Sequence, residues 1–68
     1  MNDETFNLTL RRFLKQFGIT GQREIEKAVN QALASGQLTG SETLRARARL
    51  EIEGLALETV VEGDICLT

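Results

Sequence analysis

The sequence contains no histidine, and this absence removes the commonest general base and metal ligand of proteins. Its only cysteine, Cys66, lies two residues from the C-terminus and has no histidine partner that would activate a thiol. The glycines are isolated, and none of them leads a Gly-Lys-Ser or Gly-Lys-Thr motif, so a phosphate-binding loop is missing. We therefore expect a protein that is not an enzyme, with no catalytic residue, no cofactor and no metal site.

Proline, long apolar runs and a second cysteine are also missing. No apolar stretch approaches the roughly 20 residues that cross a bilayer, and the acidic start Met-Asn-Asp-Glu does not resemble a secretory signal. A single cysteine cannot form the internal disulfides on which small secreted domains rely. These absences predict a cytoplasmic protein without membrane contact, and residues 1–68 are expected to form a single domain because no linker composition interrupts them.

Basic residues are missing from the last part of the chain, although the net charge is only −2. All eight lysines and arginines lie at or before Arg49, alongside five acidic residues, whereas residues 50–68 carry five acids and no base. A split of this kind predicts either a bipolar surface or two segments that neutralise each other when folded.

Two segments show the apolar spacing of amphipathic helices. The first is predicted over about residues 3–17, with Asn2 or Asp3 as its N-cap and Gly18 in the left-handed conformation after its last turn. The second is predicted over about residues 21–35, with Thr20 as its N-cap and Gly36 just past its end. Only a sharp turn would then separate the two helices.

The stretch from Leu44 to Glu53 alternates apolar and charged residues, which is typical of a half-buried β-strand. We predict strands over about residues 44–53 and 56–67, the second with a break near Gly63, joined as a β-hairpin. A two-residue type II′ turn at Gly54 and Leu55 would place Arg47 opposite Glu62 and Arg45 opposite Asp64. A turn shifted to Glu53 and Gly54 would instead place Arg49 opposite Glu58 and Arg45 opposite Glu62, so two registers remain open.

Together these segments predict an α+β fold, with two N-terminal amphipathic helices packed on one face of a C-terminal antiparallel β-hairpin or small meander. The predicted core contains the large apolar residues of all four segments: Phe6, Leu10, Phe13, Leu14, Phe17, Ile25, Val29, Leu33, Leu38, Leu50, Ile52, Leu57, Val61 and Ile65.

Function is predicted less directly, and the leading hypothesis is a small interaction module that binds an unknown protein partner or a second copy of itself as a homodimer. A domain of this length has a thin core, and association buries more surface. The first helix offers a candidate partner-binding patch in which three basic side chains surround an exposed leucine: Leu8, Arg11, Arg12 and Lys15. The free edges of the hairpin, with Val60 and Cys66 on its outer face, are a second place where a copy could add.

Nucleic-acid binding is the alternative, favoured less. A helix, a tight turn, a second helix and a hairpin are similar to a winged helix-turn-helix, in which Arg23 and Lys27 would face DNA. Arg45, Arg47 and Arg49 project from one strand face and could follow phosphates, or they could pair with Glu58, Glu62 and Asp64 on the neighbouring strand. The missing third helix, and Glu24 and Glu26 among the expected DNA-facing residues, speak against this alternative.

The stretch from Thr20 to Leu38, TGQREIEKAVNQALASGQL, resembles a family of short bacterial proteins of about 70 residues classed only as a domain of unknown function. A phrase similar to QREIEKAV and a later SGxL recur in that family. The resemblance covers almost the whole chain. It implies a bacterial protein of this length and carries no activity or binding residue that could be transferred.

Overall fold

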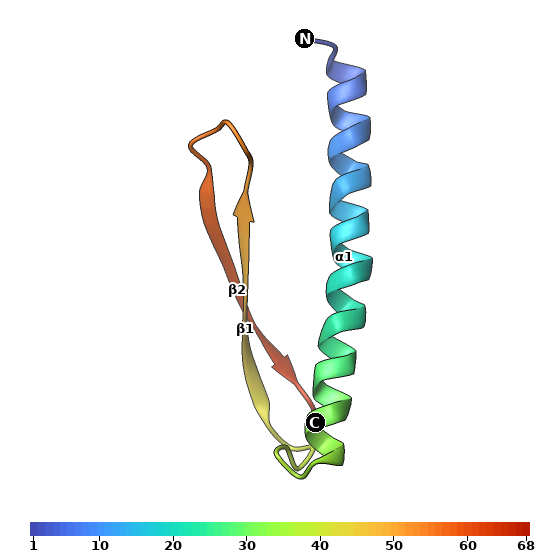
Figure 1. Ribbon diagram of the computed structural model, residues 1–68, viewed down its shortest axis with the longest axis vertical. Helices are drawn as coiled ribbons and strands as arrows, with labels where there is room; N and C mark the ends of the chain where they lie inside the picture. Colours follow the sequence, from blue (N-terminus) through green and yellow to red (C-terminus); the bar gives the residue numbers. More distant parts are fainter. The chain divides into compact units, whose positions relative to one another are not determined.

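The computed structural model describes residues 1–68 as two compact units, a helical unit over Met1–Gln37 and a hairpin unit over Leu38–Thr68. The elements are one helix and two strands: α1 Asp3–Ala34, β1 Thr43–Glu51 and β2 Glu58–Cys66 (Figure 1). The predicted α+β class and the antiparallel hairpin are confirmed. The number of helices is corrected, because one long helix stands where two were predicted.

Polar side chains and a glycine define the ends of α1. The side chain of Asn2 accepts a hydrogen bond from the backbone N–H of Thr5 at 3.1 Å, which confirms Asn2 as the N-cap. At the other end Ser35 donates its backbone N–H to the carbonyl of Gln31, and Gly36 follows with a φ of 81°. Gly36 therefore ends the helix in the conformation that favours glycine.

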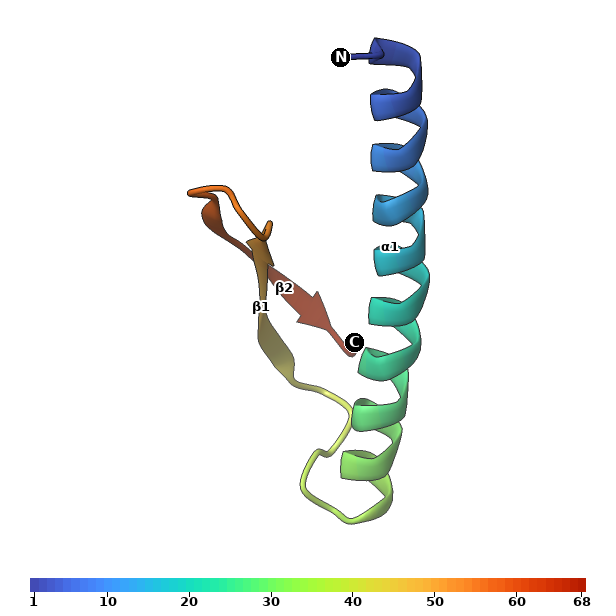
Figure 2. The same cartoon turned by 45° about the horizontal axis from the view of Figure 1, so that its top comes forward.

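The predicted break near Gly18 is wrong, since α1 continues without interruption through Gly18, Thr20 and Gly21 (Figure 2). Gly18 has a negative φ and does not adopt the left-handed conformation that was expected of it. A glycine inside a helix costs only about 1 kcal/mol relative to alanine, and no proline removes a hydrogen bond here. No helix of the chain combines the length and the apolar character that a membrane crossing requires.

The strands of the hairpin pair in the first of the two predicted registers. Arg47 lies opposite Glu62 and Arg45 opposite Asp64, so the alternative register, with Arg49 directly opposite Glu58, is not formed. β2 is continuous through Gly63, and the predicted break there is absent. Opposite charges across the ladder stabilise this pairing, although the alternative register would also place arginines opposite acids on the same face.

The turn of the hairpin is longer than predicted. The ladder ends where Glu51 lies opposite Glu58, two like charges that destabilise a directly opposed pair. Ile52 accepts a hydrogen bond from the N–H of Leu55 at 3.2 Å, and Gly54 between them has a φ of 83°. A positive φ at the third turn residue is typical of a type II turn, so the predicted type II′ turn is wrong although its register is correct.

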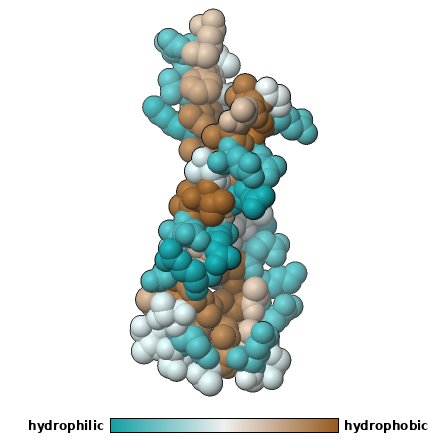
Figure 3. All heavy atoms as spheres, turned by 90° about the vertical axis from the view of Figure 1, so that its left-hand side faces the viewer, coloured by the Kyte–Doolittle hydropathy of each residue, from teal (hydrophilic) through white to brown (hydrophobic).

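The predicted core is not buried inside either unit. The side chains of Phe13 and Ile52 are 55% and 47% exposed, and none of the fourteen predicted core residues is buried. A single helix and a two-stranded sheet have no interior of their own. Hydrophobic residues therefore reach the surface between hydrophilic ones (Figure 3).

Candidate interaction surfaces

One face of α1 carries an apolar stripe that repeats every eleven residues. Phe6, Phe17 and Ala28 are separated by eleven residues, and so are Leu10, Gly21 and Ala32. Eleven residues make about three turns of a helix, so these positions share one face along the whole of α1. We call this face the helix stripe, and it comprises Phe6, Leu10, Phe13, Leu14, Phe17, Gly21, Ile25, Ala28, Val29 and Ala32.

The helix stripe changes in width along its length. Its first half, up to Phe17, consists of three phenylalanines and two leucines, whereas its second half includes Gly21, Ala28 and Ala32. A side chain built at Gly21 would meet no other atom within 4 Å, so open space lies over this point of the helix. The stripe therefore has a wide end, where its side chains are large, and a narrow end, where several of its residues are small.

Charged residues lie on α1 between the helix stripe and the face of Leu8. Arg11 is next to the stripe, whereas Lys15 and Glu26, eleven residues apart, lie nearer to Leu8. None of the three forms an ion pair within the chain, where the four ion pairs all join the two strands. Their charges are therefore available to groups outside the chain.

The predicted partner-binding patch is centred on Leu8, which lies on the side of α1 opposite the helix stripe. Leu8 is 57% exposed, and Arg11, Arg12 and Lys15 follow it at three, four and seven residues, which places them around it on one helix surface. Ile19, eleven residues beyond Leu8, lies on the same face and is half exposed. Ile19 was missed because the expected turn placed it outside the helices.

Arg23 and Lys27 lie on α1, and no separate second helix exists to present them to DNA. Arg23 borders a shallow, open depression together with Ile19, Gln22 and Glu26. All four residues come from one helix, so they cannot enclose a small ligand as a binding cleft does.

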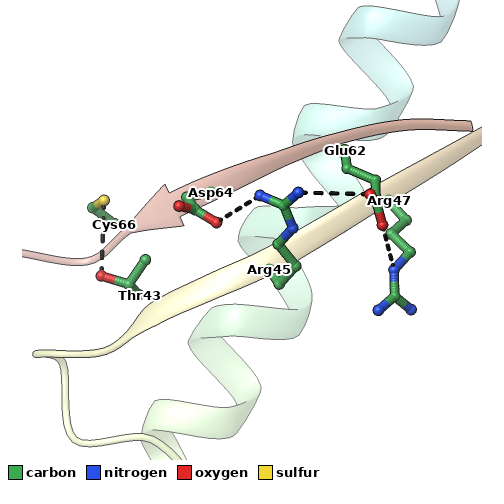
Figure 4. A network of polar contacts seen from close by, with 6 residues as sticks. All are labelled: Thr43, Arg45, Arg47, Glu62, Asp64 and Cys66. Atoms are coloured by element: carbon green, nitrogen blue, oxygen red, sulfur yellow. Dashed lines mark hydrogen bonds and ion pairs between the residues drawn. The ribbon is translucent and has the colours of Figure 1, made fainter.

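The three strand arginines pair with the acidic residues of β2. Figure 4 shows two of them, Arg45 and Arg47. Arg45 donates from Nη1 to Oδ1 of Asp64 at 3.0 Å and lies 3.6 Å from Glu62, which also accepts a hydrogen bond from Nε of Arg47 at 2.8 Å. Arg49 reaches Glu58 at 3.7 Å, although its direct neighbour in the register is Val60. These exposed pairs contribute about 0–1 kcal/mol each, and they neutralise the arginine row.

The other face of the hairpin is apolar. Leu44 lies opposite Ile65, Ala46 opposite Gly63, and Ala48 opposite Val61, which is 63% exposed. Val60 and Cys66 lie on the charged face as predicted, and the Sγ of Cys66 lies 3.9 Å from the hydroxyl of Thr43 (Figure 4). The hairpin thus has one charged, neutralised face and one apolar face.

Glu42 organises the loop that leads into β1. The backbone N–H of Thr39 donates to both carboxylate oxygens of Glu42, at 2.8 and 3.1 Å, and the N–H of Gly40 donates at 2.9 Å. These bonds, that from Thr39 first, hold the pKa of Glu42 below its usual value of 4.5. The hydroxyl of Thr68 donates to the carbonyl of Gly40 at 2.7 Å, which ties the C-terminus to the same loop.

The loop is therefore expected to loosen at acid pH. The folded pKa of Glu42 is lower than the unfolded one, so its stabilisation is complete above about pH 4.5 and is lost as the pH falls through the folded value. The amide proton shifts of Thr39 and Gly40, followed by NMR, should titrate together below pH 4.5. In Glu42→Gln this titration should disappear, and its persistence would show that another group controls the loop.

Comparison with known proteins identifies one family. A family model described as a family of unknown function, DUF6494, matches residues 1–68, which confirms the resemblance to a small domain of unknown function. No curated protein and no solved structure matches the chain.

Proposed function

We propose that this chain, which belongs to the DUF6494 family of unknown function over residues 1–68, is a non-catalytic interaction module whose binding surface is the helix stripe. The observation that carries the proposal is the exposure of this stripe along a helix of 32 residues. Phe6, Phe13 and Phe17 are each about half exposed. Phenylalanine is one of the residues enriched in protein interfaces.

The apolar residues of the helix stripe are too regularly spaced to be isolated apolar residues on a protein surface. Single exposed apolar residues need no explanation, but a contiguous apolar patch marks an interaction site. A helix in a globular protein gains most of its stability from packing its apolar face, because propensity alone is marginal in water. The stripe therefore needs a cover, and a protein surface of matching shape supplies it.

The non-catalytic part of the proposal is supported by composition. The chain has no histidine, and its acids are dispersed over α1, the loop and two strands. The place of action that we propose is the cytoplasm, because the lone Cys66 cannot form an internal disulfide. Nucleic-acid binding stays a prediction, and the carboxylates beside Arg45 and Arg47 do not favour it.

Sedimentation equilibrium tests whether the module self-associates. Between about 1 μM and about 1 mM protein, a range in which interfaces of ordinary strength form and dissociate, we expect the mass to rise from one chain toward two. The same runs at high salt should retain the association, because an apolar interface is not screened. Monomers at every concentration would contradict self-association and leave only a different protein as the partner.

A further inference from the structure

We infer that two copies of α1 pair antiparallel through the helix stripe, in a register that places residue 19 of one copy level with residue 19 of the other. This inference rests on the proposed function and specifies its partner, its orientation and its register. In this arrangement residues whose numbers add to 38 lie level with each other. The wide end of each stripe then faces the narrow end of its partner.

Three pairs of level residues match a large side chain with a small one in this register. Phe17 lies level with Gly21 of the second copy, Leu10 with Ala28, and Phe6 with Ala32, whereas Phe13 lies level with Ile25 and Leu14 with Glu24. Gly21 has open space over it in the single chain, which leaves room for a phenylalanine ring. Interfaces, like interiors, favour arrangements in which large and small groups interdigitate without voids.

A parallel pair in register would pack poorly. Phe6, Phe13 and Phe17 would each meet their own copies, and Gly21, Ala28 and Ala32 would meet theirs. The first half would then be overpacked and the second half would contain cavities, and both defects destabilise an interface. Side-chain size therefore selects the antiparallel arrangement.

The helix stripe offers a long contact surface. The stripe from Phe6 to Ala32 spans 27 residues, which corresponds to about 40 Å of helix. Three half-exposed phenylalanines contribute roughly 300 Å² per chain, if a whole aromatic side chain presents about 200 Å². The leucines, isoleucine, valine and alanines of the stripe add to this, toward the roughly 800 Å² per partner of a standard interface.

Disulfide trapping tests the orientation directly. Leu10→Cys and Ala28→Cys are made separately in a Cys66→Ser background, and the two proteins are mixed in a glutathione redox buffer. We expect a mixed disulfide between Cys at 10 and Cys at 28, with little disulfide in either protein alone, because antiparallel helices bring only unlike positions together. Leu8→Cys, on the opposite face of α1, is the control and should join neither partner.

Each outcome has a separate meaning. Disulfides of Leu10→Cys with itself would overturn the antiparallel inference and leave the helix stripe as the binding surface. Association in sedimentation without any stripe disulfide would overturn the inference and favour another surface, such as a strand edge of the hairpin. Monomers without any disulfide would overturn both the inference and self-association.

Discussion

Replacement of Phe13 by glutamate is expected to dissociate the chain into monomers, whereas the same replacement at Leu8 should leave association unchanged. Phe13 lies in the first half of the helix stripe, and Leu8 lies on the opposite face of α1. Both side chains are about equally exposed in the single chain. The two variants therefore differ in the face that they change and scarcely in anything else.

The effect at Phe13 should be large because a dimer contains this residue twice. Truncation of an aromatic anchor costs about 2 kcal/mol or more, and a carboxylate buried without a partner adds to this cost. Two copies together would lose about 4 kcal/mol, which raises the dissociation constant about 1000-fold. Sedimentation equilibrium measures this change, and circular dichroism reports whether the helix loses content as it dissociates.

The comparison also decides between two predicted surfaces. Leu8, with Arg11, Arg12 and Lys15 around it, is the candidate patch that the sequence favours for a partner. If Leu8→Glu dissociates the chain and Phe13→Glu does not, the partner binds this patch and the helix stripe is not the interface. A loss of association in both variants would show that the whole helix surface is enclosed.

The single helix shows how far the sequence can predict this fold. Both apolar segments of α1 were predicted from their spacing, and Asn2 and Gly36 at its ends were recognised by their capping chemistry. The junction was wrong because Gly18 and Thr20 were given the weight of a break, although a glycine costs only about 1 kcal/mol inside a helix. The eleven-residue spacing that joins Phe6 to Phe17 and Ala28 was the signal that could have shown continuity.

The hairpin was predicted better than its turn. Alternation identified both faces of β1, whereas the acids of β2 were compatible with two registers, of which the structure has the one that places Arg47 opposite Glu62. The turn depends on local backbone energies between Glu51 and Glu58, where two like charges end the ladder and six residues replace the expected two. The predicted two-residue turn and the observed six-residue turn have the same midpoint between Gly54 and Leu55. The predicted pairing was therefore correct although the turn type was wrong.

The residues of the candidate site could be predicted from the sequence, but their role as a binding surface could not. Phe6, Phe13 and Phe17 were recognised as one apolar stripe and assigned to a core. Hydrophobic spacing shows that a helix face is covered, and the same spacing arises whether the cover is another part of the chain or a different chain. All three are about half exposed, and a helix by itself has no interior that could cover them, so the predicted core becomes a candidate interface.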